Sequence, residues 1–321
     1  MRRLALFLAC LALCAGLWTC SRPKPLRIAI SAWAGVEVAE LAAALGLYAK
    51  HGVEVRMVRF STYSDSLAAL RGGKVDAGMH TLDDVIRSTA AGRDARVVLV
   101  TDASFGGDGL VARKEIRTLA DLKGRRVGVE VGTVGHYSLL QILKRAGLTL
   151  GDITVVSIPA WEIKEAFLAG TIDAGVTWEP YLSASAAEGG GRVLITSRDY
   201  PDTILTTMAF AAEVVRDRPG DVRRVLAAYF EAFDFLRAHP READEIMAKA
   251  EGIGVEEFLE HAKGLRYLDL AANKRLFADG RLAALTADIG AFLRGAGLIR
   301  ATPDPKVLLD GTLLPASPAA Q

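Results

Sequence analysis

The sequence contains little cysteine, and all of it lies near the N-terminus. The 321 residues include three cysteines, Cys10, Cys14 and Cys20. The rest of the chain therefore has no disulfide, no cysteine metal site and no thiol nucleophile, so an apolar core must hold the fold alone. With 51% hydrophobic and 24% charged residues, the composition is that of an ordinary globular protein, and the length suffices for about two domains.

The chain also lacks an excess of charge of either sign. Lys and Arg number 39, Asp and Glu number 38, and the formal net charge is +1. The first 20 residues hold two arginines and no acid, so the remainder has 37 basic and 38 acidic residues. This near-neutral balance argues against nucleic acid or an anionic membrane surface as the main partner.

Local signatures of catalysis are absent as well. The sequence contains no HExxH, P-loop, GxGxxG or GxSxG motif. His80 with Asp83 and Asp84 resembles a metal-ligand set, but the two acids fit the first turn of a following helix, where their charge suits the helix dipole. Composition does not exclude a Ser/His/Asp set, but no local signature proposes one. We therefore expect no catalytic residues, no metal and no cofactor.

The longest apolar run lies in residues 1–20. Arg2 and Arg3 precede an uncharged run from Leu4 to Trp18, which has the length of a secretory signal core and is short for a bilayer crossing. The run ends in Leu17-Trp18-Thr19-Cys20-Ser21, which resembles a bacterial lipobox. The resemblance implies lipid attachment at Cys20 and an extracytoplasmic protein anchored to a membrane. The alternative is a plain secretory signal with an incidental Cys20.

Two parts of the sequence are similar to each other. Residues 73–81 (GKVDAGMHT) recur as residues 170–178 (GTIDAGVTW), shifted by 97 positions. Three more landmarks recur in the same order at nearly the same offset, residues 26–30 as 126–129, 44–47 as 145–148, and 96–99 as 192–195. Chance similarity would scatter these offsets, so the pattern indicates two copies of one βαβαβ unit.

In both copies, short β-rich runs alternate with amphipathic helical stretches, which is typical of a mainly parallel sheet covered on both faces. The predicted strands are residues 26–31, 53–60, 76–80 and 97–101, and then 126–130, 153–158, 173–177 and 193–196. Residues 108–114 and 205–214 lie where the chain would cross between two lobes, and the later helices would return to the first lobe. Two crossings permit a hinge.

The predicted organisation follows from these segments. Residues 1–20 form a signal peptide, residues 26–107 and 208–300 form a discontinuous first lobe, residues 108–207 form the second lobe, and residues 301–321 form a loose tail.

An ordered set of segments carries a resemblance to a known family. The segments are Ala32-Trp33-Ala34-Gly35, residues 46–55, 73–78 and 119–129, Gly132-Thr133, residues 168–174, and Trp178-Glu179-Pro180-Tyr181. From about Leu26 to Arg300 the chain resembles the extracytoplasmic solute-binding proteins of ABC importers for nitrate, sulfonates, taurine and thiamine-precursor pyrimidines.

That resemblance implies an α/β fold of the periplasmic binding protein type II class. Two doubly wound lobes, joined by a two-crossing hinge, would close on a small solute and present it to a membrane permease and its ATPase subunit. We expect a monomer with no nucleic-acid partner.

Ligands of such open sheets lie beyond the carboxyl ends of the strands, so facing lobes would put both sets of strand ends around one cleft. The turn of residues 131–137 opens a helix through Leu140 and Leu143, and free N–H groups at a helix start attract an anion or a carbonyl oxygen. Thr133 and His136 are candidates there. The alternative is that Thr133 only caps the helix and that the glycines only form the turn.

Other candidates follow the remaining strands. Tyr63 and Ser64 lie in residues 61–66 (STYSDS), a run rich in capping residues just before a predicted helix. Helix capping alone explains part of this run. His80-Thr81 and Trp178-Glu179 occupy equivalent strand ends of the two copies. Glu179 could orient an amine or pair with a local cation, and tryptophans after strands could stack on a planar ring or exclude water. Asp102 and Ser104 lie at the expected hinge, where a turn role is the alternative. The candidate ligand-binding residues are Trp33, Gly35, Tyr63, Ser64, His80, Thr81, Ser104, Thr133, His136, Trp161, Trp178 and Glu179.

The sequence thus favours a non-enzymatic lipoprotein that captures a small organic solute by hinge closure. The helix-start glycines favour a sulfonate or taurine-like zwitterion, whereas the aromatic and acidic lining favours a pyrimidine-like heterocycle. The rival interpretations are an enzyme of pyrimidine synthesis on the same fold, whose cysteine-rich signature is absent here, and a ligand-sensing module.

Overall fold

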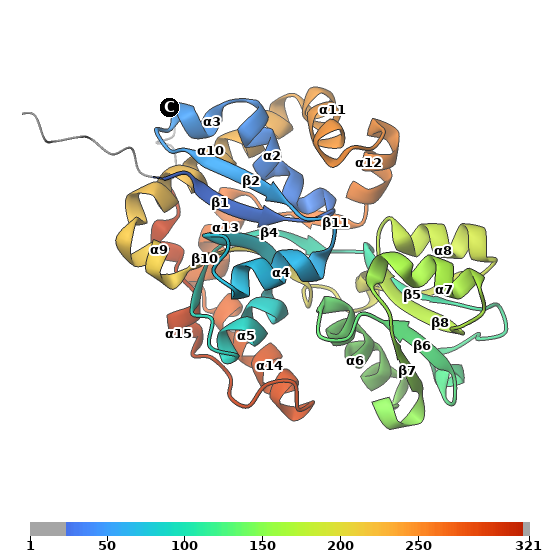
Figure 1. Ribbon diagram of the computed structural model, residues 1–321. Coiled ribbons are helices and arrows are strands. Elements are labelled where there is room, and N and C mark those ends of the chain that lie inside the picture. The colour runs from blue at the N-terminus through green and yellow to red at the C-terminus, as the bar shows by residue number, and fades with distance from the viewer. Residues whose placement is uncertain (1–23, 317–321) are drawn as a thin grey trace, which may run out of the picture.

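Two separate β-sheets organise the residues that the computed structural model describes, 24–316 (Figure 1). The first sheet has the strand order β11-β4-β10-β3-β1-β2, and the second has the order β7-β6-β8-β5-β9. The first consists of β1 Leu26–Ile30, β2 Val55–Arg59, β3 Ala77–Thr81, β4 Ala95–Ser104, β10 Leu205–Ala211 and β11 Leu265–Tyr267. The second consists of β5 Asp108–Ala112, β6 Arg126–Val129, β7 Thr154–Ser157, β8 Ala174–Trp178 and β9 Arg192–Thr196. The eight predicted strands are therefore all present.

Helices cover both sheets. Those of the first lobe are η1 Ala34–Val36, α2 Glu37–Ala44, α3 Leu47–Lys50, α4 Tyr63–Arg71, α5 Leu82–Ala90, α9 Ala212–Asp217, α10 Pro219–Ala238, α11 Pro240–Glu251, α12 Val255–Ala262, α13 Leu270–Ala278, α14 Arg281–Gly295, α15 Pro305–Leu308 and η6 Gly311–Leu313. Those of the second are η2 Leu119–Leu122, α6 Val134–Ala146, η3 Leu150–Asp152, η4 Ala160–Glu162, α7 Ile163–Leu168, α8 Tyr181–Gly189 and η5 Ser197–Asp199. Across residues 24–316, we find no helix with both the length and the apolar character that a bilayer crossing requires.

The duplicated sequence has a structural counterpart in the two sheets. β1 pairs in parallel with β2 and β3, and β6 pairs in the same way with β7 and β8. The repeated aspartate stands just before β3 and β8. Asp76 accepts hydrogen bonds from the backbone and side chain of Arg27, and Asp173 accepts the same set from Arg126. The shared aspartate therefore ties the starts of two neighbouring strands together in each lobe.

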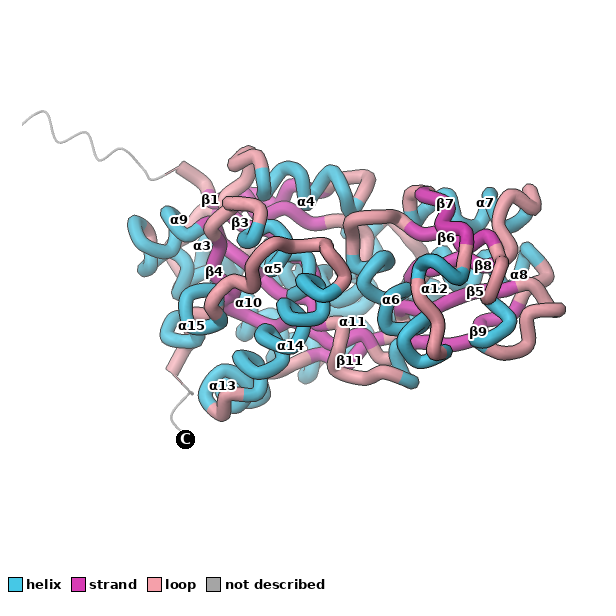
Figure 2. Tube along the Cα trace, turned by 90° about the horizontal axis from the view of Figure 1, so that it is seen from below, coloured by secondary structure: helices cyan, strands magenta, loops and turns pink. Residues whose placement is uncertain are grey.

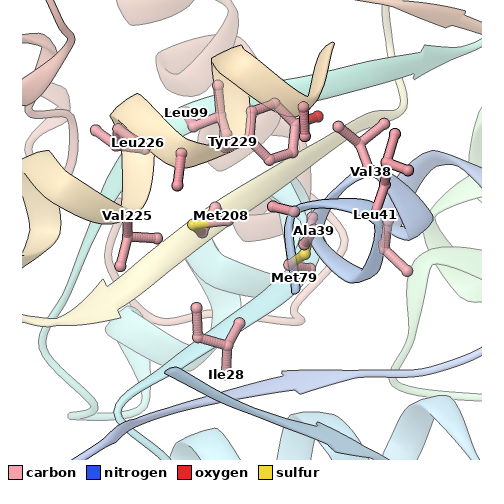
Figure 3. Packing of buried hydrophobic residues seen from close by; sticks show 14 of the residues in the cluster. Ile28, Val38, Ala39, Leu41, Met79, Leu99, Met208, Val225, Leu226 and Tyr229 are labelled. Carbon is pink, nitrogen blue, oxygen red and sulfur yellow. The ribbon is translucent and has the colours of Figure 1, made fainter. Parts of the chain in front are cut away.

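The late helices pack on the first sheet. Val225, Leu226 and Tyr229 of α10 pack toward Met208 of β10 and Leu99 of β4, with Val38 of α2 in the same cluster (Figure 3). These side chains follow the i, i+3, i+4 spacing of one buried helix face. The second lobe has its own core, which includes Val127, Leu139 and Val176, so each lobe is held by separate apolar contacts.

The two predicted crossing segments are strands. β5 runs antiparallel to β8 and β9, and β10 runs antiparallel to β3 and β4. The carboxyl ends of the parallel strands of the two sheets face each other. A chain that leaves one sheet at these ends enters the other sheet at the same ends, so its first strand there runs antiparallel to the parallel strands. The connections themselves are residues 105–107 and 197–204, and β10 joins the first sheet three residues before the predicted boundary at residue 208. Figure 2 shows the lobes side by side along the molecule.

The prediction of a loose tail from residue 301 is wrong for residues 305–313. Leu308 of α15 and Leu313 of η6 are buried, and Leu309 forms a β-bridge with Val97 at the edge of the first sheet. Asp304 caps α15 by accepting a hydrogen bond from the Lys306 N–H at 2.9 Å. Two buried leucines and a backbone bridge hold this segment on the lobe despite its prolines.

Candidate functional site

A cavity lies between the lobes, where their strand ends face each other. Its volume is about 30 Å³, which is the room that about two water molecules need. The lining comes from both lobes and one crossing, and consists of Ser31, Ala32, Trp33, Val36, Tyr63, Met79, Thr81, Asp108, Val134, Trp178, Ile204 and Thr206. Four of the predicted residues, Trp33, Tyr63, Thr81 and Trp178, are therefore brought together at this one place.

Two aromatic side chains meet across the cleft. Tyr63 begins α4 in the first lobe, where Thr62 caps the helix by accepting a hydrogen bond from the Asp65 N–H at 3.0 Å. Trp178 ends β8 in the second lobe. Their ring centroids are 5.7 Å apart at an interplanar angle of 64°, an edge-on contact that aromatic pairs favour.

Trp33 is held by a buried carboxylate. Its indole Nε1–H donates to Asp102 Oδ1 at 3.0 Å, and the hydroxyls of Thr101 and Thr206 donate to the same carboxylate at 2.7 and 3.1 Å. Burial raises the pKa of Asp102 to about 6, although these three hydrogen bonds favour the ionised form. Gly35 makes this arrangement possible, because a Cβ atom there would lie 2.1 Å from Asp102 Oδ2.

Asp108 lines the cavity and is not among the residues that the sequence predicts for the site. It is only 4% exposed. In the pairing of β5 with β8, Asp108 lies directly opposite Trp178. Burial raises the pKa of Asp108 to about 7, and the nearby carboxylates of Asp102 and Asp83 act in the same direction. The signal in the sequence is an acid directly after two glycines, at a place where the sequence predicts only that the chain crosses between the lobes.

In the described part of the chain, the lining of the cavity includes an acidic side chain but no basic one. The lining contains Asp108, but among the described residues no lysine or arginine lines it. Carboxylates attract cations and accept hydrogen bonds, and they repel anions. The geometry therefore favours a solute that presents N–H groups or positive charge.

The start of α6, where the sequence suggested an anion, is already occupied by a carboxylate. The Val134 N–H donates to Asp84 Oδ2 of the first lobe at 3.1 Å. Asp83 and Asp84 stand in the first turn of α5, as predicted, and both pair with Arg87. The described residues contain no group of three or more His, Cys, Asp or Glu side chains that could hold a metal ion.

Four predicted residues near the cavity do not line it. His80 is fully buried, its Nε2 lies 2.9 Å from Ser66 Oγ, and burial lowers its pKa to about 4, so the ring is neutral. Thr133 caps α6, accepting from the Gly135 N–H at 3.3 Å. His136 is buried in the first turn of α6, and desolvation and the charge of Arg87 lower its pKa. Gly35 acts through Asp102.

The remaining predicted residues lie at the crossings or farther out. Ser64 donates to Glu130 across the cleft, so it joins the lobes without lining the cavity. Ser104 Oγ lies 2.8 Å from Ser197 Oγ and thereby links the end of β4 to the second crossing. Trp161 is half-buried in η4, and Glu179 accepts from the Ser183 hydroxyl at 2.7 Å. Cys20, the predicted lipid attachment site, lies outside the described residues.

Comparison with known proteins assigns the family. The sequence model of the family described as NMT1/THI5 like matches residues 38–243. The chain belongs to this family.

Several relatives of this NMT1/THI5-like chain are binding proteins. A binding-protein homologue of Brucella abortus (strain 2308) is 27% identical over 286 residues, which are 88% of this chain and 89% of the relative. The taurine-binding periplasmic protein of Escherichia coli (strain K12) is 28% identical over 175 residues, 54% of each chain. The crystal structure of the periplasmic aliphatic sulphonate binding protein from Escherichia coli has a TM-score of 0.71 at 25% identity and covers 88% of this chain and 96% of that one.

These findings confirm two of the expectations from the sequence. The fold class is the two-lobed α/β fold of periplasmic binding proteins. The NMT1/THI5-like chain is a binding protein and not an enzyme: the Brucella abortus and Escherichia coli proteins that match it over most of their length are themselves described as binding proteins.

Proposed function

We propose that the chain is an extracytoplasmic solute-binding protein of an ABC importer, and that its solute is a small planar molecule with N–H donors, of the aminopyrimidine kind. The observation that carries this proposal is the cavity lining, which joins Trp33, Tyr63 and Trp178 to the carboxyl of Asp108 without a basic side chain. Aromatic rings stack on a planar heterocycle, and a carboxylate accepts from its amino group.

The solute would hold both lobes together. Trp33, Tyr63 and Thr81 reach the cavity from the first lobe, and Asp108 and Trp178 reach it from the second. A ligand favours the closed state only through its additional contacts in that state, so contacts to both lobes are required. Because the cavity of about 30 Å³ is too small for a heterocycle, the lobes must part for entry and close with their aromatic side chains spread around the ring.

A taurine-like zwitterion is the second candidate. Similarity to a taurine-binding and a sulphonate-binding protein supports it, and its ammonium group would suit Asp108. Its sulfonate would lack a basic partner in the cavity and would meet the Asp84 carboxylate at the start of α6. The local charges therefore favour the heterocycle.

We also propose that the protein is anchored outside the cytoplasm by lipid on Cys20 and delivers its solute to a permease with an ATPase subunit. The lipobox-like segment and the periplasmic relatives support this arrangement.

A thermal-shift panel tests the ligand class. The purified protein is heated with aminopyrimidines, taurine, methanesulfonate and nitrate. A solute at 100 times its dissociation constant should add about 2.7 kcal/mol of stability, and we expect the largest shift with an aminopyrimidine. A shift with methanesulfonate and nitrate but none with aminopyrimidines would contradict the proposal.

The same panel tests the role of Asp108. Asp108→Asn keeps the size of the side chain and removes its charge, so aminopyrimidine affinity should fall about tenfold or more, as expected when a hydrogen bond to a charged group is lost. Asp83→Asn is the matched control, because Asp83 is also buried but does not line the cavity. Equal effects of the two substitutions would argue against a contact between Asp108 and the solute.

A further inference from the structure

The start of α6 has an unusual electrostatic partner. α6 is 13 residues long, and its own first turn contains no acidic residue. The backbone N–H groups at a helix start carry partial positive charge and usually find a carboxylate in the first turn or an external anion. In this chain the carboxylate comes from the other lobe, from Asp84 of α5.

Asp84 is held in place by several groups. It is fully buried, and its Oδ2 accepts from the Tyr63 hydroxyl at 2.8 Å, the Thr81 hydroxyl at 3.1 Å and the Val134 N–H at 3.1 Å. Its Oδ1 accepts from Arg87 Nη2. Arg87 is 6% exposed and also pairs with Asp83 at 2.9 Å.

These contacts connect the carboxylate to the solute cavity. Tyr63, Thr81 and Val134 all line the cavity, and all three donate to the same oxygen of Asp84. The two hydroxyl groups and the backbone N–H therefore donate to Asp84 and are not available to an anionic solute. An anion that entered would have to break these bonds and approach a buried negative charge.

We infer that Asp84 determines the charge of the solute that this protein accepts. It fills the anion position at the start of α6 when the lobes close, so closure requires no negative group on the solute, and simple anions are rejected. The inference rests on the proposed solute-binding function and adds a residue that selects against one class of ligand.

Removal of the carboxylate tests the inference. In Asp84→Ala, the Val134 N–H and the Tyr63 and Thr81 hydroxyls are free, and Arg87 keeps Asp83 as its partner. We expect the affinity for methanesulfonate, measured by titration calorimetry, to rise about tenfold or more, which corresponds to one charge-assisted hydrogen bond gained.

Asp83→Asn is the matched control. It removes a buried charge from the same arginine but leaves the bond between Asp84 and Val134 in place, so methanesulfonate affinity should stay at the wild-type value. Adding Val134→Pro to Asp84→Ala localises the effect. Proline is well tolerated at the first position of a helix and has no N–H, so the part of the gained affinity that the Val134 N–H contributes should be lost.

Asp84→Asn provides a second variant with almost unchanged volume, should Asp84→Ala not fold; its affinity for methanesulfonate should rise in the same direction. A folded Asp84 variant that gains no methanesulfonate affinity, or a wild-type protein that binds methanesulfonate as tightly as the variant, would overturn the inference. Failure of the proposed solute class is distinguishable, because there the wild-type protein fails to respond to aminopyrimidines while the comparison of methanesulfonate affinities still reports on Asp84.

Discussion

At the residue scale, two carboxyl groups with little access to water lie at or beside the cavity, those of Asp108 and Asp102. Burial raises the pKa of Asp108 to about 7 and that of Asp102 to about 6. Asp102 receives three side-chain hydrogen bonds, whereas Asp108 faces the cavity. A carboxyl that is poorly compensated in the empty protein gains most when a solute donates to it, so the binding role that we propose for Asp108 carries a cost in stability.

This cost predicts a pH-dependent effect of Asp108→Asn. Because the folded protein raises the pKa of Asp108 from 3.8 to about 7, its contribution to stability is present below pH 3.8 and is lost as pH rises through 7. The variant should therefore be more stable than the wild type at pH 8, by on the order of 2 kcal/mol, with the difference vanishing near pH 4. Urea unfolding at pH 4, 6 and 8 measures this. The exposed Asp202→Asn should show no such trend, and parallel profiles for both variants would refute the assignment.

At the element scale, the segment of α15 and η6 completes the first lobe. Its leucines fill two different clusters, Leu308 among residues of α5 and α14 and Leu313 among those of α10. Pro305 stands at the first turn of α15, where proline is compatible with a helix, so this proline does not loosen the segment.

This packing predicts a large difference between two neighbouring substitutions. Leu308 is 1% exposed and Val307 is 50% exposed, although both lie in α15. Leu308→Ala should lower the free energy of unfolding by about 2–4 kcal/mol, since it leaves a cavity in the core, while Val307→Ala should change it by less than about 0.5 kcal/mol. Chemical denaturation compares the two variants. Similar small effects would mean that the segment is loosely attached.

At the scale of the whole molecule, the strands and the two lobes could be predicted because their signals are local. β-rich runs and a repeated segment containing Asp76 and Asp173 are visible in the sequence alone. The partners of Asp84 and Asp108 could not be predicted, for two different reasons. In the sequence Asp84 has the position of an ordinary first-turn acid, and its bond to Val134 depends on how one lobe meets the other. Asp108 lies opposite Trp178 because β5 runs antiparallel to β8 in the second sheet, a register that the sequence does not specify.

The proposed anchor concerns the molecule as a whole. Cys20→Ser should abolish incorporation of labelled palmitate and release the protein from the membrane fraction into the extracytoplasmic soluble fraction, because no thiol would be left to carry lipid at that position. Metabolic labelling followed by fractionation measures both. Cys14→Ser is the control and should leave labelling unchanged. Equal labelling of the Cys20→Ser variant and the wild type would exclude lipid at Cys20.

The second lobe is one uninterrupted stretch of chain, and its two ends meet. Ser104 donates its N–H to the Ile204 carbonyl at 2.9 Å, and Ala103 stands opposite Leu205 in the first sheet. A domain whose two ends lie close together is readily inserted into another chain. Two cut points, one at each end of this stretch, would therefore suffice to exchange the second lobe for that of a relative. A single recombination step could then replace the ligand contacts of the second lobe and leave those of the first lobe unchanged.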